Sequence, residues 1–188
     1  VRTKEGQTIF CPPIGHEQYK GDYQCSWQPT PIEKSILEEA KQVTKIILDN
    51  LKGAGIYGVE FFVKESYLIF SELSPRPHDT GMVTLLSQNM NEFELHLRAL
   101  LDLPIPEINL ISPAATRVIL SEDEYQKFSF YGIHEALKIK NSKILIFGKP
   151  FAKKGRRMGV AIATGLDIEQ ARLRADQCAS NIKISSSD

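Results

Sequence analysis

The sequence predicts an α+β protein whose antiparallel strands and helices fall into two successive parts of the chain. Residues 31–51 repeat apolar side chains every three or four positions, as an amphipathic helix does. Two apolar, aromatic-rich runs then flank three polar residues, which is typical of a β-hairpin. After a proline-containing connector, three further apolar runs and a last helical pattern follow.

Composition limits the class of function. The 188 residues are 42% hydrophobic and 24% charged, the proportions of a globular protein that buries a core without disulfides or metals. Lys plus Arg and Asp plus Glu both number 23, so no overall field attracts nucleic acid or an anionic membrane. No apolar run approaches the length of a membrane span. We therefore expect neither nucleic acid nor a membrane as a partner.

The cysteines and the first residues bear on location. Cys11, Cys25 and Cys178 are odd in number and lack zinc-binding spacing, which favours free thiols in a reducing compartment. The chain opens at Val1 without a basic or apolar export signal. We expect a cytoplasmic protein, and a piece of a longer chain stays an open possibility.

The first quarter of the chain is expected to hold a strand, a loop and the start of a helix. Gln7 to Cys11 fits a short strand, and the polar stretch Gly15–Tyr23 has turn residues without a period, so we expect a loop there. Thr30-Pro31-Ile32-Glu33 has the pattern of a capping box with proline at the first helical position. The helix should continue to Gly53.

The predicted hairpin pairs Tyr57–Val63 with Tyr67–Leu73 and places Glu60 opposite Glu72. Carboxylates on Cβ atoms roughly 5 Å apart would repel each other by about 3 kcal/mol. A hard cation such as Mg²⁺, shared with substrate phosphates, would compensate. The alternative is a hairpin slipped by one residue, or two glutamates splayed into water.

The residues after Glu72 extend the same face. Ser74 and Arg76 continue its alternation, and an arginine beside a carboxylate pair suits phosphoryl transfer, in which charge builds up on oxygens. Two prolines then take the chain out of regular structure. In that segment we expect His78 to be a structural histidine and Asp79 to have a binding role.

The remaining elements follow from capping and connector signals. Asn91 should cap a helix that carries Phe93, Leu97, Leu100 and Leu101 and stops before Pro104. We place the connector at Pro104-Ile105-Pro106 and the domains at 1–110 and 111–188. The second domain is expected to have strands at 114–120, 143–147 and 158–164, a helix capped by Asp167, and a frayed tail from Ser185.

A second candidate site is the basic run from Gly148 to Arg157, which holds Lys149, Arg156 and Arg157 among five cations and two glycines. Arginine suits two-pronged phosphate contacts, and glycine lets backbone amides approach an anion. The alternative is a solvated turn whose cations serve solubility.

Several motifs together resemble one enzyme family. The runs GVEFFV at 58–63 and FSELSPRPHDTGMVT at 70–84 resemble the formate-dependent phosphoribosylglycinamide formyltransferases, which are ATP-grasp enzymes. The resemblance continues upstream and downstream over nearly the whole chain, through Gly15-His16, 21–23, 26–29, 147–150 and 156–161.

The resemblance implies a fold and an activity. Residues 1–110 would be the C-terminal part of an ATP-grasp domain, followed by a small β-rich domain with a terminal helix. The family activates formate with ATP, by way of formyl phosphate, and transfers the formyl group to glycinamide ribonucleotide in purine biosynthesis. Matched by motif, the metal ligands would be Glu60 and Glu72, the catalytic residues Arg76 and Thr80, and the ribonucleotide-binding residues Asp79, Lys149, Arg156 and Arg157.

The resemblance also sets limits and alternatives. Family members are longer homodimers, so these 188 residues look like a C-terminal half that is inactive alone. Many ATP-grasp enzymes have a metal-binding Asn where this chain has Ser74, so no third protein ligand is assigned. The alternatives are the related ATP-grasp carboxylase of purine synthesis, disfavoured by Asp79-Thr80-Gly81-Met82, and a non-catalytic binding or assembly module.

Overall fold

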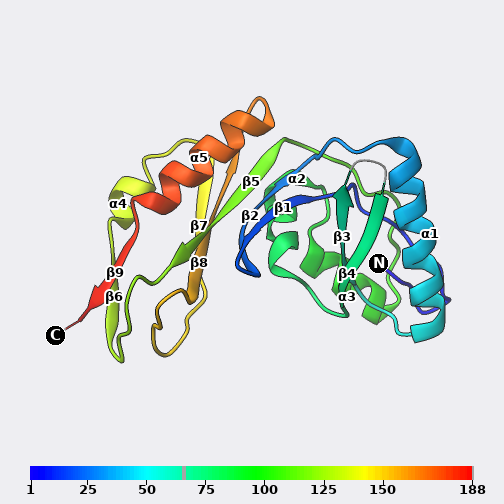
Figure 1. Cartoon of the computed structure of the whole chain (residues 1–188), viewed down its shortest axis with the longest axis horizontal. Coiled ribbons are helices and arrows are strands. Elements are labelled where there is room, and N and C mark those ends of the chain that lie inside the picture. The colour runs from blue at the N-terminus through cyan, green and yellow to red at the C-terminus, as the bar shows by residue number, and fades with distance from the viewer. Residues whose placement is uncertain (65–66, 188) are drawn as a thin grey trace.

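A computed structural model describes residues 1–64 and 67–187 of the chain, and it confirms the α+β class. Its largest element is a five-stranded antiparallel sheet in the order β1-β2-β5-β8-β7 (Figure 1). These strands are β1 Gly15–Tyr19, β2 Asp22–Gln28, β5 Ala114–Leu120, β7 Ser142–Ile146 and β8 Arg157–Thr164. Strands from both sides of residue 110 thus share one sheet, and the division into 1–110 and 111–188 stays a prediction.

Small side chains allow the helix α5, Ile168–Ser180, to lie against this sheet (Figure 1). Ala171 and Ala175 of the helix contact Ala115 and Ala163 of the sheet, and all four are fully buried. The predicted cap is confirmed, because Oδ1 of Asp167 accepts a 2.7 Å hydrogen bond from the N–H of Gln170.

The expected loop at 15–23 is wrong, because these residues form most of the β1–β2 hairpin. Lys20 and Gly21 both have positive φ, 51° and 84°, as a tight two-residue hairpin turn requires. The hydroxyl groups of Tyr23 and Ser26 lie 2.9 Å apart, and both contact Thr116 of the neighbouring strand. The hydroxyl groups of Tyr23 and Ser26 on β2 are therefore buried and paired with each other.

Two other expectations near the N-terminus are also wrong. The helix α1 spans Lys34–Leu51, and its N-cap Glu33 makes no side-chain capping bond. The hydroxyl of Thr30 instead accepts a 3.2 Å hydrogen bond from Nε1 of Trp27. In place of a strand at 7–11, Thr8 makes an isolated bridge with Arg2.

The predicted hairpin is confirmed as β3 Gly58–Lys64 and β4 Tyr67–Ser74, and the predicted loop at 65–66 lies outside the described residues. It leads into the 3₁₀ helix η1, Asp79–Val83, and the short helix α2, Thr84–Ser87. The helix α3, Glu92–Leu101, is capped by Asn91 as predicted. Its buried side chains are Glu92, Leu95 and Ala99, and the predicted apolar stripe is exposed.

The expected frayed tail from Ser185 is wrong, because the end of the chain forms a strand. The strand β9, Lys183–Ser186, pairs with β6, Phe128–Tyr131, so Ser185 is not frayed. The short helix α4, Ile133–Ala136, follows β6. No helix in the described part of the chain is long and apolar enough to span a membrane.

Candidate functional site

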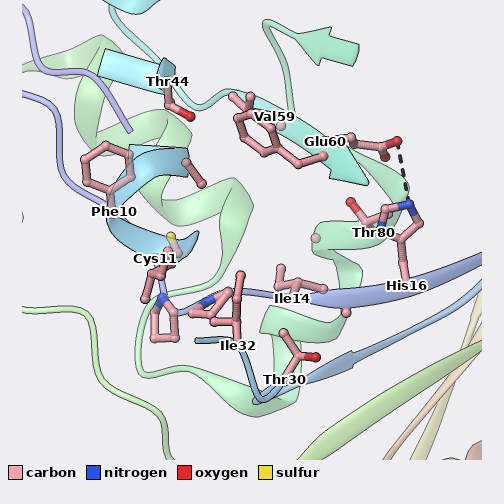
Figure 2. Close-up of a pocket in the computed structure, with 18 of the residues that line it drawn as sticks. Phe10, Cys11, Ile14, His16, Thr30, Ile32, Thr44, Val59, Glu60 and Thr80 are labelled. Atoms are coloured by element: carbon pink, nitrogen blue, oxygen red, sulfur yellow. Dashed lines mark ion pairs between the residues drawn. The ribbon is translucent and has the colours of Figure 1, made fainter. Parts of the chain in front are cut away.

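A pocket of about 860 Å³ lies between α1, the hairpin strand β3 and the N-terminal segment (Figure 2). Most of its wall is apolar, with Phe10, Ile14 and Ile32 among the side chains that face it. The polar end carries Glu60 and, as lining residues, His16, Arg76, His78, Thr80 and Glu92. A largely apolar pocket with a few converging polar groups is the usual form of a small-molecule site.

Glu60 and Glu72 face each other across the hairpin, as the register predicted. His78 lies between them, with Nδ1 3.5 Å from Oε1 of Glu60 and Nε2 3.6 Å from Oε1 of Glu72. The side chain of Glu60 is 9% exposed and that of Glu72 is 55% exposed. The pair therefore joins a buried carboxylate to one that solvent reaches.

Two residues of β1 surround the buried carboxylate. Nε2 of Gln18 donates a 3.2 Å hydrogen bond to Oε2 of Glu60, and Nε2 of His16 lies 3.6 Å from the same oxygen (Figure 2). Among the described residues, Oε1 of Glu60 has no hydrogen-bond partner. Sequence reasoning assigned neither His16 nor Gln18 to the site, although their i, i+2 spacing in a polar stretch was a signal that both share one strand face.

The exposed carboxylate has its own partner. Oγ of Ser74 donates a 2.8 Å hydrogen bond to Oε1 of Glu72, which confirms that Ser74 projects to the same side. This hydrogen bond, with a smaller contribution from His78, lowers the pKa of Glu72.

The pair has the chemistry that a hard cation prefers. Both groups offer carboxylate oxygens, and an unpaired buried oxygen such as Oε1 of Glu60 is costly unless something binds it. His78 lies close to both glutamates, but within residues 1–64 and 67–187 no group of three Asp, Glu, His or Cys side chains is arranged to hold a metal ion by itself. Water or phosphate oxygens would have to complete the coordination.

Arg76 and Thr80 line the same pocket as Glu60. Nη1 of Arg76 donates a 2.9 Å hydrogen bond to the carbonyl oxygen of Pro77. Oγ1 of Thr80 lies 2.9 Å from Nδ1 of His78, the histidine between the two glutamates. The structure thus brings a guanidinium and a hydroxyl to the pocket wall that carries Glu60, the buried member of the carboxylate pair.

The basic segment meets the turn after the hairpin. Nη1 of Arg157 lies 2.6 Å from Oδ2 of Asp79, and Arg156 stacks on the ring of Phe151 at 4.5 Å. Burial, followed by the charges of the two arginines, lowers the pKa of Lys149. Asp79, Lys149 and the arginines therefore form one partly buried cluster, in which the cations outnumber the carboxylate.

Two family models match successive parts of the chain. Residues 1–93 match the model of the ATP-grasp domain, and residues 114–182 match that of the PurT C-terminal domain.

Named relatives and solved structures agree with these matches. The formate-dependent phosphoribosylglycinamide formyltransferase of Prochlorococcus marinus (strain MIT 9515) is 64% identical over 98% of this chain and 47% of its own length. The relative from strain NATL1A is 55% identical over 97% of this chain and 47% of its own length.

Among solved structures, glycinamide-RNase-transformylase T from Mycobacterium tuberculosis is 33% identical, with a TM-score of 0.74 over 92% of this chain and 45% of its own. The N5-carboxyaminoimidazole ribonucleotide synthetase of Thermotoga maritima is 28% identical, with a TM-score of 0.86 over 100% of this chain and 51% of its own. The chain spans about half the length of the curated relatives it matches. It belongs to the ATP-grasp family of formate-dependent phosphoribosylglycinamide formyltransferases, and it corresponds to the C-terminal half of such a protein.

Proposed function

We propose that the chain forms the C-terminal part of an enzyme that uses ATP and formate to formylate glycinamide ribonucleotide in purine biosynthesis. One observation carries the proposal: Glu60, which faces Glu72 across the hairpin, shares a pocket wall with Arg76 and Thr80, directly before the turn that bears Asp79. The names of the most similar relatives supply the reaction.

The carboxylate pair binds the metal ion in this proposal. Glu60 and Glu72 hold Mg²⁺, which when bound neutralises charge on the phosphates of ATP. Arg76 and Thr80 face the reacting formate, where the guanidinium stabilises the negative charge of the phosphoryl group. Formate attacks the γ-phosphorus of ATP, ADP leaves, and the amine of the ribonucleotide then displaces phosphate from formyl phosphate.

The basic cluster binds the ribonucleotide in this proposal. Arg156, Arg157 and Lys149 bind its phosphate, and Asp79 accepts hydrogen bonds from its polar groups. The close approach of Arg157 to Asp79 supports a shared site, because the side chains of both residues are 34% exposed and accessible to a ligand.

The remaining features of the proposal concern the whole protein. We propose a cytoplasmic homodimer with ATP, formate and ribonucleotide as its small-molecule partners and no nucleic acid or membrane partner. The 188 residues alone are inactive in this proposal, since a triphosphate needs more contacts than one arginine and a cation held by two carboxylates provide.

The test uses a protein of the relatives' length that contains this chain. Labelled formate, Mg·ATP and glycinamide ribonucleotide should give formylated ribonucleotide with equimolar ADP. Turnover of bicarbonate and aminoimidazole ribonucleotide instead would favour the carboxylase alternative. The name of the Thermotoga maritima structure, N5-carboxyaminoimidazole ribonucleotide synthetase, describes an enzyme of that kind. No turnover with either pair would favour a non-catalytic module.

A further inference from the structure

A buried acid lies behind the turn from His78 to Gly81. Glu92 is the first residue of α3 and is 3% exposed. Carboxylates are rarely buried so deeply unless their oxygens are paired. Oε2 of Glu92 accepts a 2.8 Å hydrogen bond from the backbone N–H of His78, whereas Oε1 finds no partner in the described part of the chain. The fold retains a costly group at this position.

Thr84 completes a ring of hydrogen bonds around the same turn. Its hydroxyl donates to the carbonyl oxygen of Gly81 at 2.6 Å and accepts from the backbone N–H of Glu92 at 2.9 Å. The N–H of Gly81 donates to the carbonyl oxygen of His78 at 2.8 Å, which closes the turn. Both ends of the turn are thus tied to the start of α3, and the two residues between them are held in place.

Gly81 shows how closely the carboxylate approaches the turn. A Cβ atom at this position would collide with the carboxylate of Glu92. Any side chain there would have to displace the acid or the turn, so the two are in direct contact. Glu92 also lines the pocket that contains Arg76 and Thr80.

We propose that Glu92 is a positioning residue: together with Thr84 it fixes the His78–Gly81 turn, so that Asp79 meets Arg157 and Thr80 faces the pocket. The hydrogen bonds belong to the chain itself, whereas their consequence for catalysis rests on the proposed function. The two parts are therefore tested separately.

Hydrogen exchange, measured by NMR on the 188-residue chain, tests the hydrogen-bond ring. Glu92→Met keeps the side-chain length but offers no strong acceptor, so exchange of the His78 amide should rise roughly ten- to hundredfold, as expected when a partly buried donor loses its acceptor. Glu92→Gln keeps an acceptor oxygen and should restore most of the protection. Glu94→Gln, on the solvent side of the same helix, is the matched control and should leave His78 unchanged.

Unchanged exchange at His78 in a folded Glu92→Met chain would overturn the proposal. If that variant does not fold, Thr84→Val decides, because it removes both bonds of the threonine hydroxyl at nearly constant volume. It should speed exchange of the Glu92 amide by a similar factor, and wild-type exchange there would also count against the ring.

Kinetics in the longer protein test the positioning role. Glu92→Met or Thr84→Val should raise the KM for ribonucleotide through Asp79 and lower kcat through Thr80, without changing the KM for ATP; Glu92→Gln should rescue the effects of Glu92→Met. Wild-type constants for these variants, in an enzyme that does formylate ribonucleotide, would refute the role. If the wild-type protein formylates nothing, the proposed function fails, and hydrogen exchange alone decides whether Glu92 holds the turn.

Discussion

Arg157 and Asp79 form an ion pair of 2.6 Å between Nη1 and Oδ2, although they lie far apart in the sequence. Asp79 begins η1 after the hairpin, and Arg157 begins the strand β8 of the large sheet. The pair thus connects the turn beside the carboxylate pair to the basic segment, and it gives the two candidate subsites a common boundary.

Removing Arg157 should affect ligand binding more than folding. The pair is about one-third exposed, so Arg157→Ala should cost at most about 1 kcal/mol of unfolding free energy. In the longer protein it should raise the KM for ribonucleotide roughly tenfold or more, since a charge-assisted phosphate contact is worth roughly 1.5–3 kcal/mol. In Arg157→Lys the KM for ribonucleotide should return only part of the way to the wild-type value, because a lysine cannot make a two-pronged phosphate contact.

The control for this prediction is Lys154→Ala, which removes an exposed cation of the same turn. Chemical denaturation and steady-state kinetics check both variants. If Lys154→Ala and Arg157→Ala behave alike, the segment is a solvated turn.

Neutralising either glutamate of the pair should impair metal use without unfolding the protein. Glu60→Gln or Glu72→Gln removes the repulsion between facing carboxylates but also removes a ligand oxygen with full negative charge. We expect a severe loss of Mg·ATP use in the longer protein and no loss of thermal stability. Activity titrated against Mg²⁺ is the measurement, and an unchanged Mg²⁺ requirement in both variants would remove the metal assignment.

Glu92 should make stability depend on pH. Burial, reinforced by the charge of Asp79 and opposed by the His78 N–H and by Arg76, raises the pKa of Glu92 from its usual 4.5 to about 7. The native state then binds more protons than the unfolded state between these values, so stability falls as pH rises through this window. The unfolding free energy of Glu92→Gln minus that of the wild type should grow by about 3 kcal/mol across it.

Denaturant melts of the 188-residue chain at several pH values check this sign and size. Glu94→Gln serves again as the control, because Glu94 is 39% exposed and pairs with Arg98. The account would be contradicted if the unfolding free energy of Glu92→Gln minus that of the wild type stayed constant from pH 4.5 to above about pH 7. Glu92 would then titrate at its usual pKa of 4.5.

Gly15 should be intolerant of a methyl group for a reason of packing. A Cβ atom there would overlap the indole of Trp27, which also stacks against Arg172 at 4.4 Å and covers the alanine cluster below α5. Gly15→Ala should therefore destabilise the chain by about 1–3 kcal/mol, the usual cost of overpacking. Thermal unfolding measures this, and the double variant with Trp27→Phe should recover part of the loss; additive losses would contradict the packing explanation.

The hairpin could be predicted because its strands are neighbours in sequence and its short loop fixes the register. The surroundings of Glu60 could not be predicted from the sequence. His16 and Gln18 reach it from a strand far back in the sequence, in a stretch whose polarity suggested a loop. That strand belongs to a hairpin whose buried hydroxyls are paired with Thr116, and no local pattern reveals a partner so distant.

Periodicity also predicted the helix α3 but not its buried side. Phe93 and Leu97 are exposed, at 40% and 56%, while the charged Glu92 is buried. Its burial follows from the hydrogen bond to the His78 amide, which depends on how the loop after the hairpin folds back onto the helix. Tertiary contacts of this kind override an amphipathic pattern.

Two adjacent subsites, one for the metal and one for the ribonucleotide, meet at the turn after the hairpin in the function proposed for this chain. Steady-state kinetics of the longer protein, with Mg²⁺ and ribonucleotide varied in a matrix, tests this most directly in Glu72→Gln and Arg157→Ala. We predict that Glu72→Gln raises the Mg²⁺ requirement and leaves the KM for ribonucleotide unchanged. Arg157→Ala should raise the KM for ribonucleotide and leave the Mg²⁺ requirement unchanged. Equal effects of both variants on both ligands, or no effect on either, would contradict the two-subsite arrangement.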